Sequence, residues 1–272
     1  MRGRLASAAA AAVSLVLVAV PSFRAEADVP RYGVKPVDGS RWGLARFRAG
    51  RMIRGACAHR ACLALTFDDG PDEHTTSAIL DILDQHGVRA TFFVTGHRFD
   101  GHGAVAVRNR ATLATTFARG HLVGNHTYHH YSLDSLDAAA LAYEIDRTDS
   151  LIAQVLGERT FLFRAPYGVF RTQAAMQAVY SRGLTPVFWT IDTRDWEARS
   201  PEQVLATFRT GLDDSPNGGV VLFHDTLERT VQALPLVFAD VEARNVARRR
   251  RGEPLYEFVG LDELWQPVRP ER

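Results

Sequence analysis

Two histidines four residues apart and two adjacent aspartates are the residues of this sequence best suited to catalysis. The segment NHTYHH carries His126 and His130, and in a helical turn this spacing points both imidazoles the same way. The segment LTFDDGP places Asp68 and Asp69 after an apolar run and before a Gly-Pro turn. Two imidazoles and one carboxylate are a zinc ligand set that leaves positions open for water and substrate. The pattern therefore predicts a catalytic metal site, for which His129 is a competing ligand.

Further polar residues follow other apolar runs of the chain. They are Arg164 and Tyr167, Asp192 and Asp195, and His224. The carboxyl ends of strands in a parallel barrel meet on one face, where active sites are built, so we expect these side chains to share one pocket. Successive strand residues point to opposite faces, so the chain must bend at Asp68 and Asp69 if both carboxylates are to enter that pocket. One carboxylate could then bind a metal while the other acts as a base.

Short apolar segments alternate with amphipathic stretches of helical length. The expected strands are 62–68, 90–96, 121–126, 160–167, 185–192, 219–225 and 256–261, and the clearest expected helices are 75–87, 135–157 and 200–212. Strands that are apolar on both faces are typical of buried parallel sheets, and the alternation favours a parallel α/β barrel. An open doubly wound sheet is the alternative, although no Gly-rich phosphate-binding loop accompanies the strands.

Five short motifs in a fixed order resemble those of the polysaccharide deacetylases, the NodB-homology group or carbohydrate esterase family four. They are TFDDGP (66–71), HTYHH (126–130), RAPYG (164–168), DTRDW (192–196) and LFH (222–224). The resemblance covers roughly residues 60–265. It implies a single domain folded as a distorted (β/α) barrel with about seven parallel strands. It also implies a metal-dependent hydrolase that removes N-acetyl groups from N-acetylglucosamine-type polysaccharide.

The resemblance also implies a role for each motif residue. Asp68 would be the general base and would be held by Arg164. The metal ligands would be Asp69, His126 and His130, for which zinc is the best-suited ion and cobalt or nickel are alternatives.

On the other side of the implied site, His224 would be the general acid and Asp195 would tune it. The backbone N–H of Tyr167 would stabilise the oxyanion, and Trp196 and Leu222 would line the acetyl pocket. The segments 97–110 and 248–251 depart from the family pattern and could alter the substrate groove.

Residues 1–27 have the features of a cleaved signal peptide. Arg2 and Arg4 precede an uncharged run, and Ala25-Glu26-Ala27 is a small-x-small cleavage pattern. We therefore expect a secreted or periplasmic protein without a membrane span after cleavage. Residues 28–60 would form a lead-in, 61–265 the domain, and 266–272 a C-terminal tail.

The net charge of the chain argues against nucleic acid as a partner, and its two cysteines suggest a disulfide. The net charge is +1, and loss of residues 1–27 would change it to −1, so no electrostatic footprint for nucleic acid is expected. The basic run 248–251 precedes Gly252 and is explained by the end of a solvated helix. Cys57 and Cys62 could form a disulfide in an oxidising compartment. The sequence carries no signal for oligomeric state.

Three functions remain in competition on the sequence alone. The leading hypothesis is a secreted N-deacetylase acting on peptidoglycan, chitin-like oligomers or exopolysaccharide. The second is an O-acetyl esterase acting on xylan or wall glycan. The third, from another class, is a non-catalytic glycan-binding protein with the same fold.

Overall fold

The computed structural model describes residues 61–264. The expected signal peptide, the lead-in and the C-terminal tail lie outside the described residues, and so does Cys57. Within the described part of the chain, no helix has both the length and the apolar character that a membrane crossing requires. Cys62 is buried at the beginning of the first strand.

Parallel strands form the centre of the domain, as the sequence predicted. They are β1 (Ala61–Asp68), β2 (Thr91–Val94), β3 (Leu122–Asn125), β4 (Leu162–Phe163), β5 (Thr185–Pro186), β6 (Ile191–Asp192), β7 (Gly218–His224) and β8 (Tyr256–Phe258). Their order is β5-β4-β3-β2-β1-β7-β6, and β8 pairs with β1 outside this path. β8 pairs with the beginning of β1 and β2 with its end, while β7 follows nearly its whole length.

The single strand expected over 185–192 is divided in two. β5 pairs with β4, whereas β6 pairs with β7 at the other end of the strand order. Pro186 has no N–H to donate to a ladder, which favours a break at this point. Residues 187–190 therefore connect the two edges of the sheet, and the barrel is closed there by the chain itself rather than by a ladder. This is the distortion of the (β/α) barrel, and it confirms the predicted fold class.

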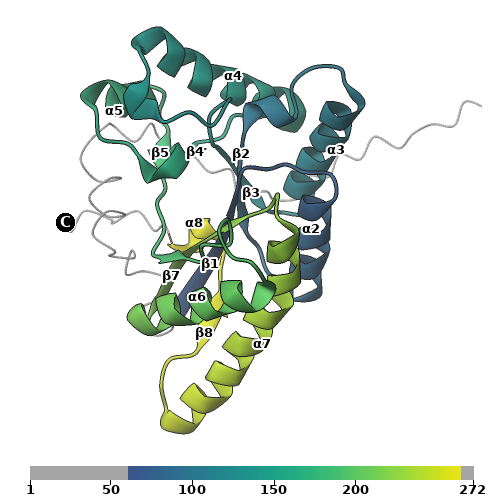
Figure 1. Cartoon of the computed structure of the whole chain (residues 1–272), viewed down its shortest axis with the longest axis vertical. Coiled ribbons are helices and arrows are strands. Elements are labelled where there is room, and N and C mark those ends of the chain that lie inside the picture. The colour runs from purple at the N-terminus through teal and green to yellow at the C-terminus, as the bar shows by residue number, and fades with distance from the viewer. Residues whose placement is uncertain (1–60, 265–272) are drawn as a thin grey trace, which may run out of the picture. The chain divides into compact units, whose positions relative to one another are not determined.

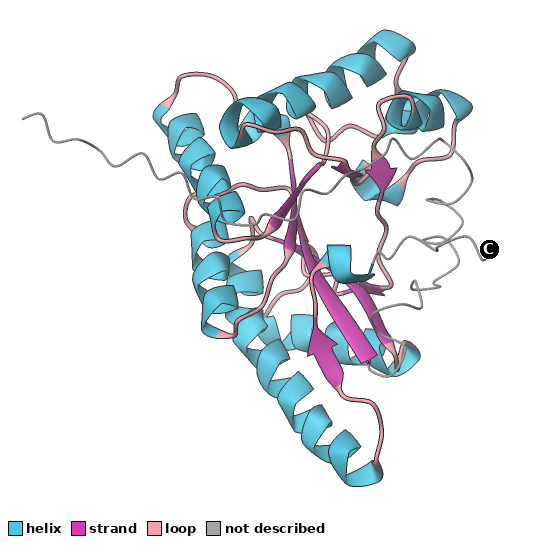
Figure 2. Ribbon diagram, turned by 180° about the vertical axis from the view of Figure 1, so that it is seen from behind, coloured by secondary structure: helices cyan, strands magenta, loops and turns pink. Residues whose placement is uncertain are grey.

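Helices follow the strands and cover the sheet. They are α2 (Thr75–Gln85), α3 (Ala104–Ala118), α4 (Ala138–Leu156), α5 (Gln173–Tyr180), α6 (Pro201–Asp214), α7 (Glu228–Arg251) and α8 (Leu261–Leu264). Figure 1 and Figure 2 show α2, α3 and α7 on the same side of the long strands. Three short 3-10 helices, Gly96–Arg98, Leu133–Ser135 and Pro166–Gly168, lie in the connections.

Three helix ends lie at the residues that the sequence signals indicated, whereas α4 begins three residues later than expected, after its cap at Asp137. The Ser200 side chain accepts a hydrogen bond from Gln203 N–H and is followed by Pro201 at the first helical position of α6. Gly157 ends α4 and Gly252 ends α7, both with left-handed backbone. The basic run 248–251 is the last turn of α7, where positive charges interact favourably with the negative end of the helix dipole.

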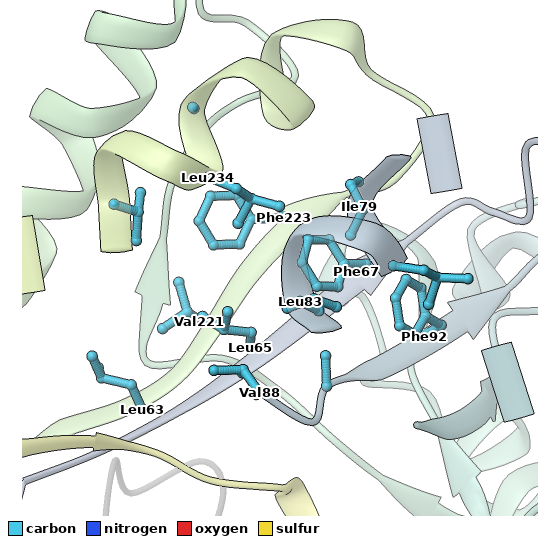
Figure 3. Packing of buried hydrophobic residues seen from close by; sticks show 14 of the residues in the cluster. Leu63, Leu65, Phe67, Ile79, Leu83, Val88, Phe92, Val221, Phe223 and Leu234 are labelled. Atoms are coloured by element: carbon cyan, nitrogen blue, oxygen red, sulfur yellow. The ribbon is translucent and has the colours of Figure 1, made fainter. Parts of the chain in front are cut away.

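The alternation of side chains along β1 separates two apolar layers. Leu63, Leu65 and Phe67 face α2 and α7, and Figure 3 shows Phe67 between Phe92 and Phe223. The ring centroid of Phe67 lies 5.0 Å from that of Phe92 and 5.7 Å from that of Phe223. Fully burying a side chain of this size contributes about 1.5–3 kcal/mol. The opposite face of β1 looks into the barrel, and Asp68 lies on that face at the carboxyl end of the strand.

Candidate metal centre and active site

The chain bends between the two aspartates, as predicted. Asp68 is the last residue of β1 and is buried, whereas Asp69 has a left-handed backbone with φ 76°. This reversal turns both carboxylates toward the same histidine. His126 Nε2 lies 3.7 Å from Asp68 Oδ2 and 3.5 Å from Asp69 Oδ1. The carboxyl end of β1 therefore presents two acids to one site.

Asp69, His126 and His130 converge on one point. Their ligand atoms all lie within 4.8 Å of one another, and His130 Nε2 is 3.4 Å from Asp69 Oδ1. The expectation of a helical turn between the two histidines is wrong, because Thr127 and His130 have left-handed backbone with φ 68° and 64°. An irregular loop after β3, rather than helical spacing, brings the two imidazoles together.

His129, the competing ligand, belongs to a different contact. Its Nδ1 lies 2.6 Å from Glu144 Oε1, and Glu144 Oε2 accepts hydrogen bonds from the backbone N–H groups of His129 and Tyr128. Glu144 is buried on α4, so it holds the histidine loop from behind. Sequence reasoning missed this residue, although an acid on the apolar face of a helix was a detectable signal.

A second polar contact fixes the same loop from β3. Asn125 accepts a hydrogen bond from Thr127 N–H at 2.8 Å and donates one to the carbonyl of Ile145 at 2.9 Å. The side chain of Asn125 is fully buried, so both bonds form away from water, where a polar group left without a partner would destabilise the fold. The left-handed backbone of the loop is thereby held by buried hydrogen bonds.

The donor set fits a divalent cation. His126 Nδ1 lies 2.7 Å from the carbonyl oxygen of Arg164, which assigns the proton to Nδ1 and leaves the Nε2 lone pair toward Asp69. Burial lowers the pKa of His126 to about 3, although Asp69 opposes the shift, so the ring is neutral as a ligand must be. Among the described residues, Asp69 Oδ1 is buried without a hydrogen-bond partner. A cation would satisfy that oxygen.

Arg164 and Asp68 form a buried ion pair beside this centre. Arg164 Nη1 lies 2.7 Å from Asp68 Oδ1 and 2.8 Å from Thr66 Oγ1, and its Nε donates to the carbonyl of Val187. Burial raises the pKa of Asp68, while Arg164 and nearby histidines oppose the rise. A carboxylate with a raised pKa and a fixed orientation is suited to accept a proton.

His224 and Asp195 form a second acid–base pair at the end of β7. His224 Nδ1 lies 2.6 Å from Asp195 Oδ1, and Asp195 Oδ2 accepts from His224 N–H and from Thr230 Oγ1. Burial lowers the pKa of His224, but the hydrogen bond and charge of Asp195, with Asp68 and Asp69, outweigh it and raise this pKa to about 9. These contacts favour the protonated form of His224.

The remaining predicted residues lie around these groups. Tyr167 has φ 59° and an exposed ring whose centroid is 4.7 Å from that of His130. Trp196 follows Asp195 and is half exposed. Leu222 is buried in β7, two residues before His224 and therefore on the same strand face.

The two departing segments lie in different kinds of structure. The segment 97–110 runs from the 3-10 helix after β2 through the connection 99–103 into α3, and 248–251 belongs to α7.

Comparison with known proteins identifies the family. The family model "Polysaccharide deacetylase" matches residues 55–187. A peptidoglycan-N-acetylglucosamine deacetylase of Bacillus cereus is 32% identical over 212 residues, which are 76% of this chain and 70% of that protein. The chain belongs to the polysaccharide deacetylase family. This confirms the resemblance drawn from the five motifs.

Other members of the polysaccharide deacetylase family are similar over different shares of their length. Peptidoglycan-N-acetylglucosamine deacetylase PgdA of Listeria monocytogenes is 30% identical over 75% of this chain, but the match spans only 38% of that protein. A chitooligosaccharide deacetylase of Azorhizobium caulinodans is 33% identical over 61% of this chain and 75% of its own length. The solved structure of the Bc1960 peptidoglycan N-acetylglucosamine deacetylase superimposes with a TM-score of 0.63 at 28% identity, covering 76% of this chain and 89% of that one.

Proposed function

We propose that this chain is a secreted, metal-dependent N-deacetylase that hydrolyses the acetamide of N-acetylglucosamine units in peptidoglycan or chitin-like oligosaccharide. The observation that carries the proposal is that three groups of side chains meet at the carboxyl ends of β1, β3, β4, β6 and β7. These groups are the Asp69–His126–His130 cluster, the Asp68–Arg164 pair and the His224–Asp195 pair. The names of the relatives support the substrate class.

The cluster of Asp69, His126 and His130 would hold a divalent cation, with zinc as the proposed ion. Such an ion, when bound, polarises the acetyl carbonyl and lowers the pKa of water. Asp68 would take the proton of the attacking water, because its Oδ2 lies toward the cluster while its Oδ1 is held by Arg164. Arg164 is rigid because three of its hydrogen bonds are buried, so it orients the base.

The second half of the reaction requires an acid, because an unprotonated amine is a poor leaving group. His224 would give its proton to the amine nitrogen, and Asp195 would hold the ring orientation through Nδ1. The left-handed backbone at Tyr167 supports the proposal that its N–H turns toward the developing oxyanion. Trp196 and Leu222 would enclose the acetyl methyl group. The protein would thus supply base, oxyanion donor and acid from different strand ends.

The decisive experiment is acetate release from N-acetylglucosamine oligomers and from peptidoglycan by residues 28–272. We expect release that a chelator abolishes and that zinc restores, with cobalt and nickel as comparison ions. The matched control is His126→Ala, which loses one ligand and should stay inactive after metal addition. Release of acetate from O-acetylated xylan alone would replace the proposal with an esterase. Tight glycan binding without any acetate release in the presence of metal would replace it with a binding protein.

Secretion has its own test. Expression of the full chain in a host with a general secretion pathway should yield a mature protein that begins near residue 28. N-terminal sequencing of the exported protein measures this directly. Retention of Met1 on a protein in the cytoplasm would contradict the signal-peptide interpretation.

A further inference from the structure

Asp225 is a buried carboxylate that the proposed reaction does not use. It follows His224 at the end of β7, and the alternation of side chains directs it to the opposite side of the strand, toward α2. Its side chain is fully buried, and Thr76 Oγ1 in the first turn of α2 donates to its Oδ2 at 2.6 Å. A residue on this face cannot touch a substrate that lies over the barrel interior.

The carboxyl group of Asp225 packs directly against Gly70, the residue after Asp69. A Cβ added to Gly70 would lie 2.1 Å from Asp225 Oδ2 and 2.5 Å from Oδ1, so no side chain fits between them. Gly70 is not in the left-handed region, and its lack of a side chain is therefore explained by this contact rather than by backbone conformation. The Asp225 carboxylate therefore limits the space open to the turn that carries Asp69.

Hydrogen bonds join Asp225 to both ends of this turn. The backbone N–H of Asp225 donates to the carbonyl of Asp68 at 3.2 Å, and its own carbonyl accepts from Thr75 Oγ1 at 2.6 Å. Thr76 Oγ1, which donates to the carboxylate, also accepts from Asp72 N–H at 2.8 Å. The segment from Asp68 to Thr76 is thus attached to the end of β7 at three points.

We propose that Asp225 is a positioning residue that confines Gly70 and thereby holds the left-handed backbone of Asp69, so that the Asp69 carboxylate stays opposite His126 and His130. The proposal rests on the proposed metal site. It assigns no proton transfer to Asp225, and its effect on the reaction passes through Asp69. The position of the ligand is set by the volume of the carboxyl group and by its contact with Thr76.

The test is the zinc dissociation constant of the metal-free protein, measured by competition with a chromogenic chelator. Groups that hydrogen-bond a metal ligand are worth about 10- to 100-fold in affinity. Asp225 acts on Asp69 through Gly70, so Asp225→Ala should weaken zinc binding by about 10-fold, the lower end of that range. Asp225→Asn keeps the volume and an acceptor for Thr76 and should stay within about threefold of the wild type. As a control for lost stability, Val204→Ala removes buried volume from α6 and should leave zinc affinity unchanged.

A double-mutant cycle isolates the contact with Gly70. Gly70→Ala alone should weaken zinc binding, because its methyl group collides with the Asp225 carboxylate. In the Asp225→Ala background the same methyl group enters vacated space, and Gly70→Ala should cause less than a twofold further loss. Additive losses in the cycle, or equal zinc affinity of Asp225→Ala and the wild type, would overturn the proposal, as would a loss in Asp225→Asn as large as in Asp225→Ala. Failure of the wild type to bind zinc would instead overturn the proposed metal site.

Discussion

The His224–Asp195 pair permits a quantitative prediction of how one substitution changes the pH dependence of catalysis. Asp195→Asn keeps the shape of the side chain and an acceptor for His224 Nδ1–H, but it removes the charge and replaces Oδ2, which accepts from His224 N–H and Thr230 Oγ1, with an amide donor. The pKa of His224 is raised to about 9. Without the charge of Asp195, burial, which lowers this pKa, is opposed by the charges of Asp68 and Asp69. We take about 6.5, the ordinary histidine value, for the variant. A cation bound at Asp69 lowers both values together and leaves their difference, so the pH values given below refer to the metal-free pKa values and move down with them.

The size of the effect follows from the fraction of His224 that is protonated. At pH 8 this fraction is about 0.9 for a pKa of 9 and about 0.03 for a pKa of 6.5, a ratio of about 30. At pH 6 both fractions exceed about 0.7, and the ratio is less than about twofold. Because protonated His224 is the active form, kcat/KM should fall as pH rises through the pKa, and this alkaline limb should begin about 2.5 pH units lower in the variant.

The assay is kcat/KM for acetate release from an N-acetylglucosamine oligomer between pH 5.5 and 10, with metal held in excess. Thr230→Val is the matched control, because it removes one hydrogen bond to Asp195 but retains the charge, and it should move the limb by less than about half a unit. An alkaline limb that lies at the same pH in Asp195→Asn and in the wild type would refute the reasoning, since it would show that Asp195 does not act through the proton on His224.

Three further predictions concern stability and the metal loop. Arg164→Met leaves Asp68 buried without its counter-charge and should lower the free energy of unfolding by about 3–5 kcal/mol, measured by urea denaturation at pH 7.5; a loss under about 1 kcal/mol would contradict it. Burial lowers the pKa of His121 to about 4. Because the unfolded chain takes up this proton near pH 6.5 and the folded protein only near pH 4, the free energy of unfolding should be unaffected by His121 above about pH 6.5 and should fall as the pH drops from about 6.5 toward 4. Between pH 7.5 and 4.5, the wild type should therefore lose about 2.5 kcal/mol more than His121→Asn in the same denaturation assay, and equal losses would contradict this. Glu144→Gln gives up the charged acceptor of His129 and should weaken zinc binding about 10-fold in the chelator competition, whereas an unchanged dissociation constant would show that the loop holds itself.

Local signals predicted the elements well. The cap at Ser200 with Pro201, the glycines that end α4 and α7, and the apolar runs of β1 and β7 are consequences of backbone chemistry within a few residues. The bend at Asp69 was also predictable, because two adjacent strand residues cannot otherwise face one site. The weaker strands were shorter than expected, and 185–192 was divided, because their pairing depends on neighbours far away in the chain.

By itself, the sequence determined which residues carry the proposed chemistry and at which strand ends they lie, because residue type and strand alternation are local properties. Only the tertiary structure decided how these residues meet. Arg164 reaches Asp68 across 96 positions of the chain, and Glu144 supports the histidine loop from a helix that the motifs do not include. The irregular path from His126 to His130 likewise follows from buried hydrogen bonds rather than from helical spacing. These contacts depend on strand order and register, which are set by the packing of the whole sheet.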